Sequence, residues 1–400
     1  MEAQNSSAPI RTSKGQLVAI AVTGAAALIG IGLWVYQLQE GLEVTNMRNL
    51  NSWGLYITNF MFLVGLSAGG LIISSAPKVF GVKGFESISK VAIWTSICCT
   101  LLAVAFVVID LGNPLRLWEL LVYSNMTSPL MWDIIVISTY LVVSVIYLVV
   151  SVRADQGKVG HTAQRALSAV ALVIAVSVHS VTAWVFSLQV SHEFWHTALM
   201  APWFVCSALL SGLALVLVVC VILNKTGYLS VSPDLFAKLA RLLATFALVD
   251  LYFLGCDLLT SAYGADDGRA IAAMMTTGPL APFFWTEVLS GLACAVICMV
   301  PALRTKGMLA VAGILGILGI FCKRCQIILA GFGVTNLTLS GIEVGNSFPL
   351  SEMGQALAGL APHLVYFPSL VEFAIVGGVI CLGVCVFLLG LRFLPLRSQN

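Results

Sequence analysis

Charged residues are scarce in this sequence. Only 10% of its 400 residues are Asp, Glu, Lys or Arg, whereas 59% are hydrophobic and the mean hydropathy is +0.99. Soluble domains carry about 25% charged residues, so this composition excludes a water-soluble fold. The 20 basic residues exceed the 18 acidic ones by only two. The sequence therefore lacks the excess of positive charge that is typical of nucleic-acid-binding proteins.

The sequence also lacks the motifs of nucleotide, haem and cluster chemistry. It has no Walker A motif and no dinucleotide fingerprint. Of its five His, only His179 falls inside a predicted span, so a haem with two axial His ligands is not expected. The eleven Cys all fall in apolar stretches, and no loop carries a four-Cys group. We therefore expect no haem, iron–sulfur cluster or metal site in this chain.

Long hydrophobic runs are what the sequence has instead. A bilayer-spanning helix needs about 20 mostly apolar residues. Ten such runs are present, near 16–37, 53–75, 90–110, 130–152, 165–188, 201–223, 237–260, 280–301, 308–331 and 366–392. The first run is longer than a signal-peptide core and has no clear cleavage site, so it is predicted to be retained. We predict an all-α integral membrane protein with about ten transmembrane helices.

Basic residues gather on one side of these spans. That side holds Arg11, Lys14, Lys78, Lys83, Lys90, Arg153, Lys158, Arg165, Lys225, Lys238, Arg241, Arg304, Lys306, Arg392 and Arg397. The other side holds Arg48, Arg116 and Arg269. Because loops rich in Lys and Arg stay in the cytoplasm, both termini are predicted to be cytoplasmic.

A short internal repeat indicates how the spans are grouped. Pro129-Leu-Met-Trp132-Asp133 opens the fourth span, and Pro282-Phe-Phe-Trp285 opens the eighth in the same way. The repeat predicts two four-helix bundles with flanking helices; chance similarity of apolar segments is the alternative. The predicted domains are 1–52 (tail, first helix and outer loop), 53–188 (first bundle), 189–331 (second bundle) and 332–400 (outer loop and last helix). The long connection 332–365 is predicted to hold a helix on the membrane surface.

Ionisable residues inside the spans are few and mostly share one half of the membrane. They are Asp110, Asp133, His179, Asp250, Asp257, Glu287, Lys323, Arg324 and Glu372, with Asn59 as a neutral polar companion. Buried charges in a bilayer are costly, which makes each a candidate functional residue. All lie in the predicted outer half except Asp250, which is near mid-depth. Since ion pairs with a purely structural role have no reason to choose one leaflet, we predict a site that works with something on the outer face.

Each of these residues also has a structural explanation. Buried ion pairs would account for Asp133, Asp257 and Arg324, and a helix end for Asp110. His179 would be a hydrogen-bonded core residue and Glu372 an interfacial one. Trp132, Trp184, Trp203 and Trp285 fall near the outer interface and are interpreted as aromatic-belt residues.

Helical spacing adds two expectations. Lys323 and Arg324 are adjacent and point roughly 100° apart, so at most one should face a given site. Asp133, Tyr140, Ser144 and Tyr147 share one stripe of the fourth span, as a proton path or as bundle contacts. We see no continuous polar path through the cytoplasmic half and expect no proton pumping.

Five segments of the sequence resemble the NrfD/PsrC family of membrane subunits. They are Trp53-Gly-Leu-Tyr-Ile-Thr-Asn-Phe-Met-Phe-Leu-Val-Gly-Leu-Ser-Ala-Gly69, the pair Asp110-Leu-Gly-Asn-Pro and Ser128-Pro-Leu-Met-Trp-Asp133, His179-Ser-Val-Thr-Ala-Trp184, and Pro368-Ser-Leu-Val-Glu372. The similarity covers about 50–395. With ten predicted spans rather than eight, the sequence resembles one branch of the family. That branch contains the membrane subunits of sulfite-reduction-linked complexes, a hydrogenase and alternative complex III.

The resemblance implies a haem-free subunit of a respiratory oxidoreductase in the prokaryotic cytoplasmic membrane. Its ligand is then menaquinone or another quinone. Its partners are an iron–sulfur subunit on the outer face and a molybdopterin or multihaem catalytic subunit, so this chain has no complete active site alone. The quinone is expected in the first bundle.

Residue by residue, Asp110 and Asp133 match the acids of the family motif, and Asn59 and His179 match by helix and depth. We take these four as quinone-binding residues. Asp250, Asp257, Glu287 and Arg324 are assigned to proton exchange or to orienting the site.

Two other functions remain open at this stage. Carboxylates inside the membrane and a repeat also suit a proton-coupled or solute transporter, although transporter sites lie at the midplane between broken helices. A membrane anchor without its own quinone site is the other alternative. An iron–sulfur protein that co-purifies argues against the transporter, and bound quinone argues against the anchor.

Overall fold

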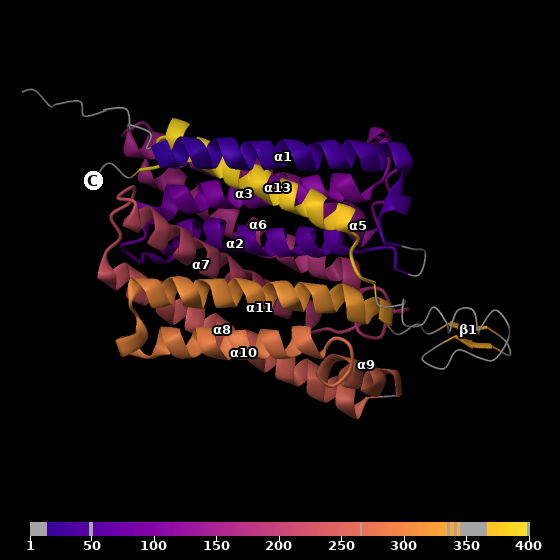
Figure 1. Cartoon of the computed structure of the whole chain (residues 1–400). Coiled ribbons are helices and arrows are strands. Elements are labelled where there is room, and N and C mark those ends of the chain that lie inside the picture. The colour runs from indigo at the N-terminus through magenta and orange to yellow at the C-terminus, as the bar shows by residue number, and fades with distance from the viewer. Residues whose placement is uncertain are drawn as a thin grey trace, which may run out of the picture.

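A bundle of long, nearly parallel helices makes up the computed structural model, which describes residues 14–47, 51–264, 266–333, 337–339, 342–344 and 366–397 (Figure 1). Within these ranges, ten helices are long and apolar enough to span a membrane. They are α1 (Lys14–Glu40), α2 (Leu55–Phe80), α3 (Glu86–Asp110), α5 (Pro129–Asp155), α6 (His161–Ser187), α7 (Met200–Lys225), α8 (Pro233–Tyr263), α10 (Ala281–Met299), α11 (Lys306–Gly333) and α13 (Leu370–Phe393). The predicted all-α membrane fold with ten spans is confirmed.

Shorter elements connect these helices. They are η1 (Leu42–Val44), η2 (Pro114–Arg116), α4 (Glu119–Val122), α9 (Asp266–Thr276), η3 (Pro301–Leu303), and two antiparallel strands, β1 (Leu337–Leu339) and β2 (Ile342–Val344). The surface helix predicted between 332 and 365 falls largely outside the described residues.

The helix ends follow local signals. Pro129 opens α5 and Pro282 lies in the first turn of α10, where the missing N–H leaves no helical bond unmade. Ser369 caps α13: its side chain accepts a hydrogen bond from Glu372 N, and the Glu372 carboxylate accepts one from Ser369 N. Glu372 is fully buried within the protein in the first turn of α13, and its interfacial position in the membrane stays a prediction.

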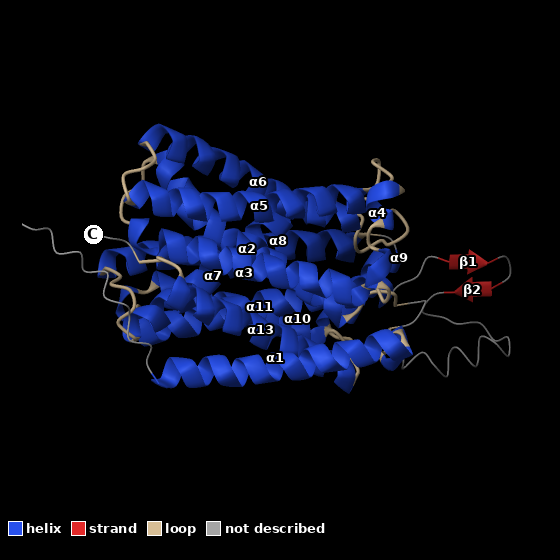
Figure 2. Cartoon of the chain, turned by 90° about the horizontal axis from the view of Figure 1, so that it is seen from above, coloured by secondary structure: helices blue, strands red, loops and turns tan. Residues whose placement is uncertain are grey.

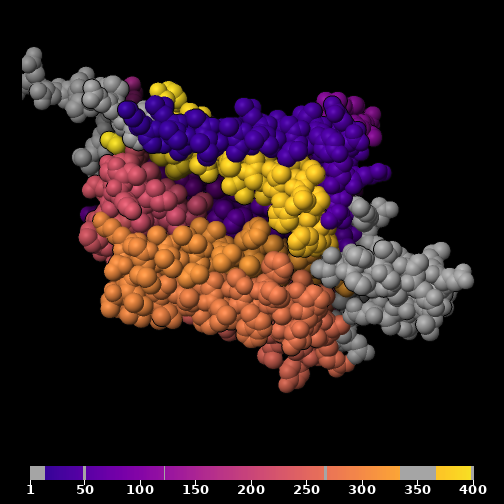
Figure 3. All heavy atoms as spheres, in the orientation of Figure 1, coloured from indigo at the N-terminus to yellow at the C-terminus, as the bar shows by residue number. Residues whose placement is uncertain are grey.

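The helices pack in groups that are contiguous in the chain. In the first group α2 packs against α3 and α6, and α5 lies between α3 and α6. In the second group α10 packs against α8 and α11, and both α8 and α11 pack against α7. The pair α1 and α13 forms one edge of the molecule (Figures 2 and 3). The division into domains remains a prediction.

Both described ends of the chain lie at one end of the bundle, which we call the termini end; we call the other the far end (Figure 1). The helices α1, α3, α6, α8 and α11 begin at the termini end. The cytoplasmic location of the termini stays a prediction.

Helix α2 joins the two groups through a close crossing with α7. A Cβ atom added at Gly69 would collide with the backbone of Gly212, and one added at Gly212 would collide with that of Gly69. Membrane helices gain from van der Waals packing when small residues let backbones approach in this way. The crossing therefore brings side chains of both groups within reach of each other.

We expect Gly212→Ala to destabilise the protein by about 1–3 kcal/mol, because the methyl group forces α2 and α7 apart. Gly255→Ala on α8 is the control, since a Cβ there meets nothing within 4 Å. Thermal unfolding of the two variants in detergent measures the difference. Equal midpoints would show that the crossing tolerates a side chain.

Candidate functional site

The first polar cluster lies between α5 and α6 near the far end. Asp133 occupies the first turns of α5 and is 4% exposed. Thr182 Oγ1 donates a hydrogen bond of 2.6 Å to Asp133 Oδ1. His179 lies three residues before Thr182, on the same face of α6. Asp133 and His179 thus belong to one buried region, with Thr182 between them.

The imidazole of His179 is buried but incompletely bonded. The residue is 2% exposed, and its Nε2 atom has no hydrogen-bond partner in the described part of the chain. The Arg324 guanidinium of α11 is close enough to be its electrostatic neighbour. A core histidine would be expected to satisfy both ring nitrogens, so the structural explanation for His179 fits poorly.

Arg324 lies between the two groups of helices. Its Nη2 donates to Ser207 Oγ of α7 at 2.6 Å, and its guanidinium carbon lies 3.9 Å from the centre of the Phe204 ring. A Cβ added at Gly65 of α2 would lie 3.8 Å from Nη2. Although Arg324 is 1% exposed, its Nε and Nη1 atoms have no partner in the ranges described.

Buried unpaired N–H groups on a cation are costly and need an explanation. The ion pair expected for Arg324 is not found among the described residues, nor is one for Asp133 or Asp257. Together, Arg324 and His179 leave three nitrogen atoms that an oxygen-bearing ligand or water could satisfy.

A second cluster surrounds Lys323, between α8, α10 and α11. The Lys323 ammonium lies 2.5 Å from Asp250 Oδ1 and 4.0 Å from Glu287 Oε1. Gln326 Nε2 donates to Glu287 Oε2 at 2.8 Å. All four side chains are at most 3% exposed. A cavity of about 10 Å³ bordered by Asp250 and Glu287 has room for roughly one water.

From the sequence, Lys323 counts among the buried charges without a role of its own, and Gln326 is not singled out. Gln326 is three residues after Lys323 and therefore shares its face of α11, a signal that was available. Trp203 was misassigned to the aromatic belt: it is 2% exposed, and the Lys323 ammonium lies 3.8 Å from its ring centre. As the 100° offset predicts, Lys323 and Arg324 face different partners.

Asp110 belongs to a third polar group, at the far ends of α1, α2, α3 and α13. Its Oδ1 atom is buried without a partner in the described segments, and Glu372 is its electrostatic neighbour. The Tyr366 hydroxyl donates to Glu372, and the Tyr56 hydroxyl donates to Gln37 Oε1 at 2.6 Å. Burial and the bond to Glu372 raise the pKa of Tyr366, so this phenol stays protonated.

The remaining predicted residues are more isolated. Asn59 is 2% exposed, and its amide donates to Leu55 O of its own helix at 2.8 Å. Asp257 lies near the end of α8 and lines a cavity of about 160 Å³ together with Glu193, His196 and Thr260. The structure therefore brings together Asp133 and His179 with Arg324, and separately Asp250 with Glu287. It places Asp110 and Asp257 elsewhere.

Buried hydroxyl groups continue from Asp133 toward the termini end. Tyr140, Ser144 and Tyr147 are fully buried on α5. The Tyr140 hydroxyl lies 2.7 Å from Ser96 Oγ and donates to Ser67 O at 2.9 Å; the Tyr147 hydroxyl donates to Ser74 O at 2.8 Å. This half of the bundle is therefore not purely apolar. The bonds to carbonyls of α2 hold α5 against it.

Comparison with known proteins adds independent findings. A family model described as "Polysulphide reductase, NrfD" matches residues 43–336. A protein of Halobacterium salinarum, described as a dimethyl sulfoxide reductase membrane subunit, is 32% identical over 97% of this chain and 94% of its own. The Hdr-like menaquinol oxidoreductase integral membrane subunit of Archaeoglobus fulgidus is 28% identical, with 94% and 92% covered. A polysulfide reductase component of Wolinella succinogenes is 25% identical, with 70% and 94% covered.

The Lys323 cluster generates a stability prediction. Lys323→Met leaves Asp250 and Glu287 buried without their cation, so we expect a loss of about 3–5 kcal/mol. Combining it with Asp250→Asn removes the nearer of the two uncompensated carboxylates and should recover part of that loss. Thermal unfolding of the two single variants and the double variant in detergent tests the coupling. Strictly additive effects would mean that the ion pair contributes nothing to the fold.

Proposed function

The chain belongs to the polysulphide reductase NrfD family, and on that premise we propose that it binds a quinone and links the membrane quinone pool to a multi-subunit oxidoreductase. Relatives over most of its length are named as parts of menaquinol oxidoreductase and polysulfide reductase. The chain itself is a multi-pass membrane protein. One observation carries the proposal: His179 and Arg324 are buried electrostatic neighbours, and both have nitrogen atoms without hydrogen-bond partners among the described residues.

The donor set fits a quinone head group. When bound, a quinone takes up or releases two electrons together with two protons. Its two carbonyl oxygens need hydrogen-bond donors, and its ring needs apolar walls. His179 Nε2 and the free nitrogens of Arg324 supply donors, and the ring of Phe204 supplies an apolar face beside them.

Each residue has a distinct role in this proposal. Arg324 keeps its charge at all physiological pH values, so it orients the ligand and does not exchange protons. His179 can give or take a proton at Nε2, the ring atom that has no hydrogen-bond partner among the described residues. Asp133 of α5 accepts a hydrogen bond from Thr182, which lies about one turn after His179 on the same face of α6. In this proposal the Asp133 carboxyl group passes protons to or from His179. Asn59 and Asp110 stay predictions as quinone-binding residues.

The carboxylates of the second group of helices have different surroundings. Asp250 and Glu287 are held by Lys323, which favours a role in positioning α11, and with it Arg324, over free proton exchange. Asp257 lines a polar cavity near the far end, where it could exchange protons with water. Menaquinone is the quinone named for two relatives, and we propose it for this chain.

The proposed partners are an iron–sulfur subunit docked on the far end and a molybdopterin or multihaem catalytic subunit beyond it. Relatives are named as parts of selenate, polysulfide and menaquinone reductases, which are multi-subunit by those names. The Asp133, His179 and Arg324 side chains lie toward the far end. Electrons would therefore cross the shortest distance between a bound quinone and the iron–sulfur subunit if that subunit docks there. Co-purification of an iron–sulfur protein would separate this function from that of a transporter.

We expect Asp133→Asn and His179→Ala each to lower quinone-coupled turnover by about 100-fold, because each removes a group from the proposed route of protons to and from the ligand. His161→Ala is the matched control, since it changes the same residue type at the exposed start of α6. The assay uses the purified complex with menaquinol or menaquinone. The same complex, supplied with a soluble electron carrier that bypasses the membrane, shows whether the other subunits remain active and attached.

Normal quinone-coupled rates in both variants would reject the site. Loss of both the coupled and the bypass reactions would instead show that the complex fails to assemble. The quinone content of the purified complex distinguishes the proposal from a plain membrane anchor, which would retain none.

A further inference from the structure

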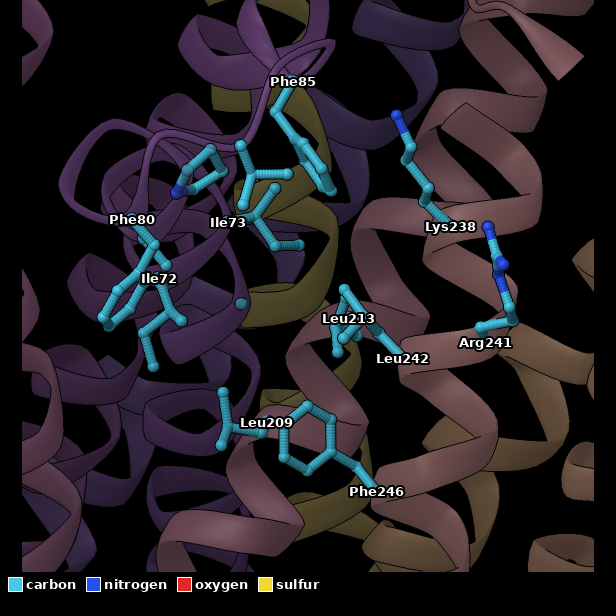
Figure 4. Close-up of a pocket in the computed structure, with 14 residues that line it drawn as sticks. Ile72, Ile73, Phe80, Phe85, Leu209, Leu213, Lys238, Arg241, Leu242 and Phe246 are labelled. Atoms are coloured by element: carbon cyan, nitrogen blue, oxygen red, sulfur yellow. The ribbon is translucent and has the colours of Figure 1, made fainter. Parts of the chain in front are cut away.

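A cavity of about 480 Å³ lies at the termini end, away from the polar clusters. It is a groove between α2, α7 and α8, bordered at one end by the loop before α3 (Figure 4). Its walls are formed by apolar side chains such as Ile72, Leu213, Leu242 and Phe246. Leu242 is 40% exposed and Phe80 is 71% exposed, so the groove opens toward the surroundings of the bundle.

Only two of the fourteen residues that line the groove are polar or charged, and both are cations. They are Lys238 and Arg241, in the first turns of α8. Figure 4 shows their nitrogen atoms at the same end of the groove as Phe85, whereas Leu209 and Phe246 lie at the other, deeper end. The groove therefore has a positively charged mouth and a hydrocarbon interior.

The surroundings of the mouth are basic as well. Lys83 is exposed in the loop after α2, and its carbonyl accepts a hydrogen bond of 3.5 Å from Lys238 Nζ. Arg165 of α6 donates to Val79 O at 3.2 Å, next to Phe80. Lys238 also pairs with Asp234 at 2.7 Å, but no carboxylate in the described segments pairs with Arg241. Arg241 is thus the cation most available to an anion.

We propose that this groove binds one anionic membrane lipid, with a hydrocarbon chain between α2, α7 and α8 and its phosphate at Arg241 and Lys238. Basic pockets between membrane helices near the bilayer surface are suited to such head groups. A quinone fits less well, because the deep end has no hydrogen-bond donor for its carbonyl oxygens and its head group carries no charge. This inference is independent of the proposed quinone site.

The bound lipid would also explain how an open gap is tolerated beside the crossing of α2 and α7. Gly69, which makes the backbone contact with Gly212, forms part of the groove wall. A hydrocarbon chain lying against Gly69 supplies the van der Waals contacts that α8 does not provide there.

Native mass spectrometry of the full chain in detergent tests the proposal, with phosphatidylglycerol, phosphatidylcholine, menaquinone and inorganic phosphate as separate probes. We expect one phosphatidylglycerol to bind more tightly than phosphatidylcholine or menaquinone, and phosphate alone not to bind. Removing one of these charges should weaken phosphatidylglycerol binding by roughly fivefold. Arg241→Gln should have a larger effect than Lys238→Gln, because Asp234 already compensates the charge of Lys238.

Two matched controls make the result specific. The pair Arg153→Gln and Lys158→Gln removes the same charge from the same end of the bundle, outside the groove. Leu242→Trp fills the groove without changing charge and should abolish binding of both phospholipids, whereas Leu248→Trp, exposed elsewhere on α8, should not.

Three outcomes would overturn the proposal. The first is phosphatidylglycerol affinity that is unchanged in both the charge variants and Leu242→Trp. The second is an equal loss in the Arg153 and Lys158 control pair, which would indicate general attraction to a basic surface. The third is preferential retention of menaquinone that depends on Leu242 but not on Arg241, which would make the groove a quinone site.

Discussion

A cation inside a bilayer costs free energy unless a partner neutralises it, and α11 places two such cations side by side. Lys323 meets this requirement with Asp250, Glu287 and the ring of Trp203. Arg324 meets it only in part, with one hydroxyl and one aromatic ring. The contrast separates the two adjacent residues: Lys323 is neutralised within the second group of helices, whereas Arg324 keeps N–H groups without partners among the described residues.

The position of Arg324 depends on how closely the helices approach. The Gly69 and Gly212 crossing lets α2 lie against α7, and α11 packs against both. In this packing the Arg324 guanidinium on α11 is an electrostatic neighbour of His179 on α6. The candidate quinone site is therefore a property of the boundary between the two groups of helices and not of the first bundle alone.

The two ends of the molecule differ chemically. Toward the far end, buried acids, His179 and Arg324 suit a ligand that exchanges protons. At the termini end, the groove offers hydrocarbon walls and cations but no proton-exchanging carboxyl group. A lipid at one end and a quinone at the other would use the same helices, α2 and α7, on either side of the glycine crossing. Between them, the hydroxyl groups of Tyr140 and Tyr147 on α5 donate hydrogen bonds to carbonyls of α2.

Sequence alone determined the ten spans, because hydrophobicity summed over about 20 residues is a local property that no tertiary contact reverses in a bilayer. It also identified His179, Asp133 and Arg324 as exceptional, since a polar group in an apolar run is visible without any structure. Partners are not local, however. Only the packing decided that Lys323 takes Asp250 and Glu287, that Asp110 lies with Glu372 and apart from Asp133, and that Trp203 is buried under an ammonium group. Helical spacing fixes which side chains share a face, but which helix that face meets depends on close backbone crossings between residues as distant in the chain as Gly69 and Gly212.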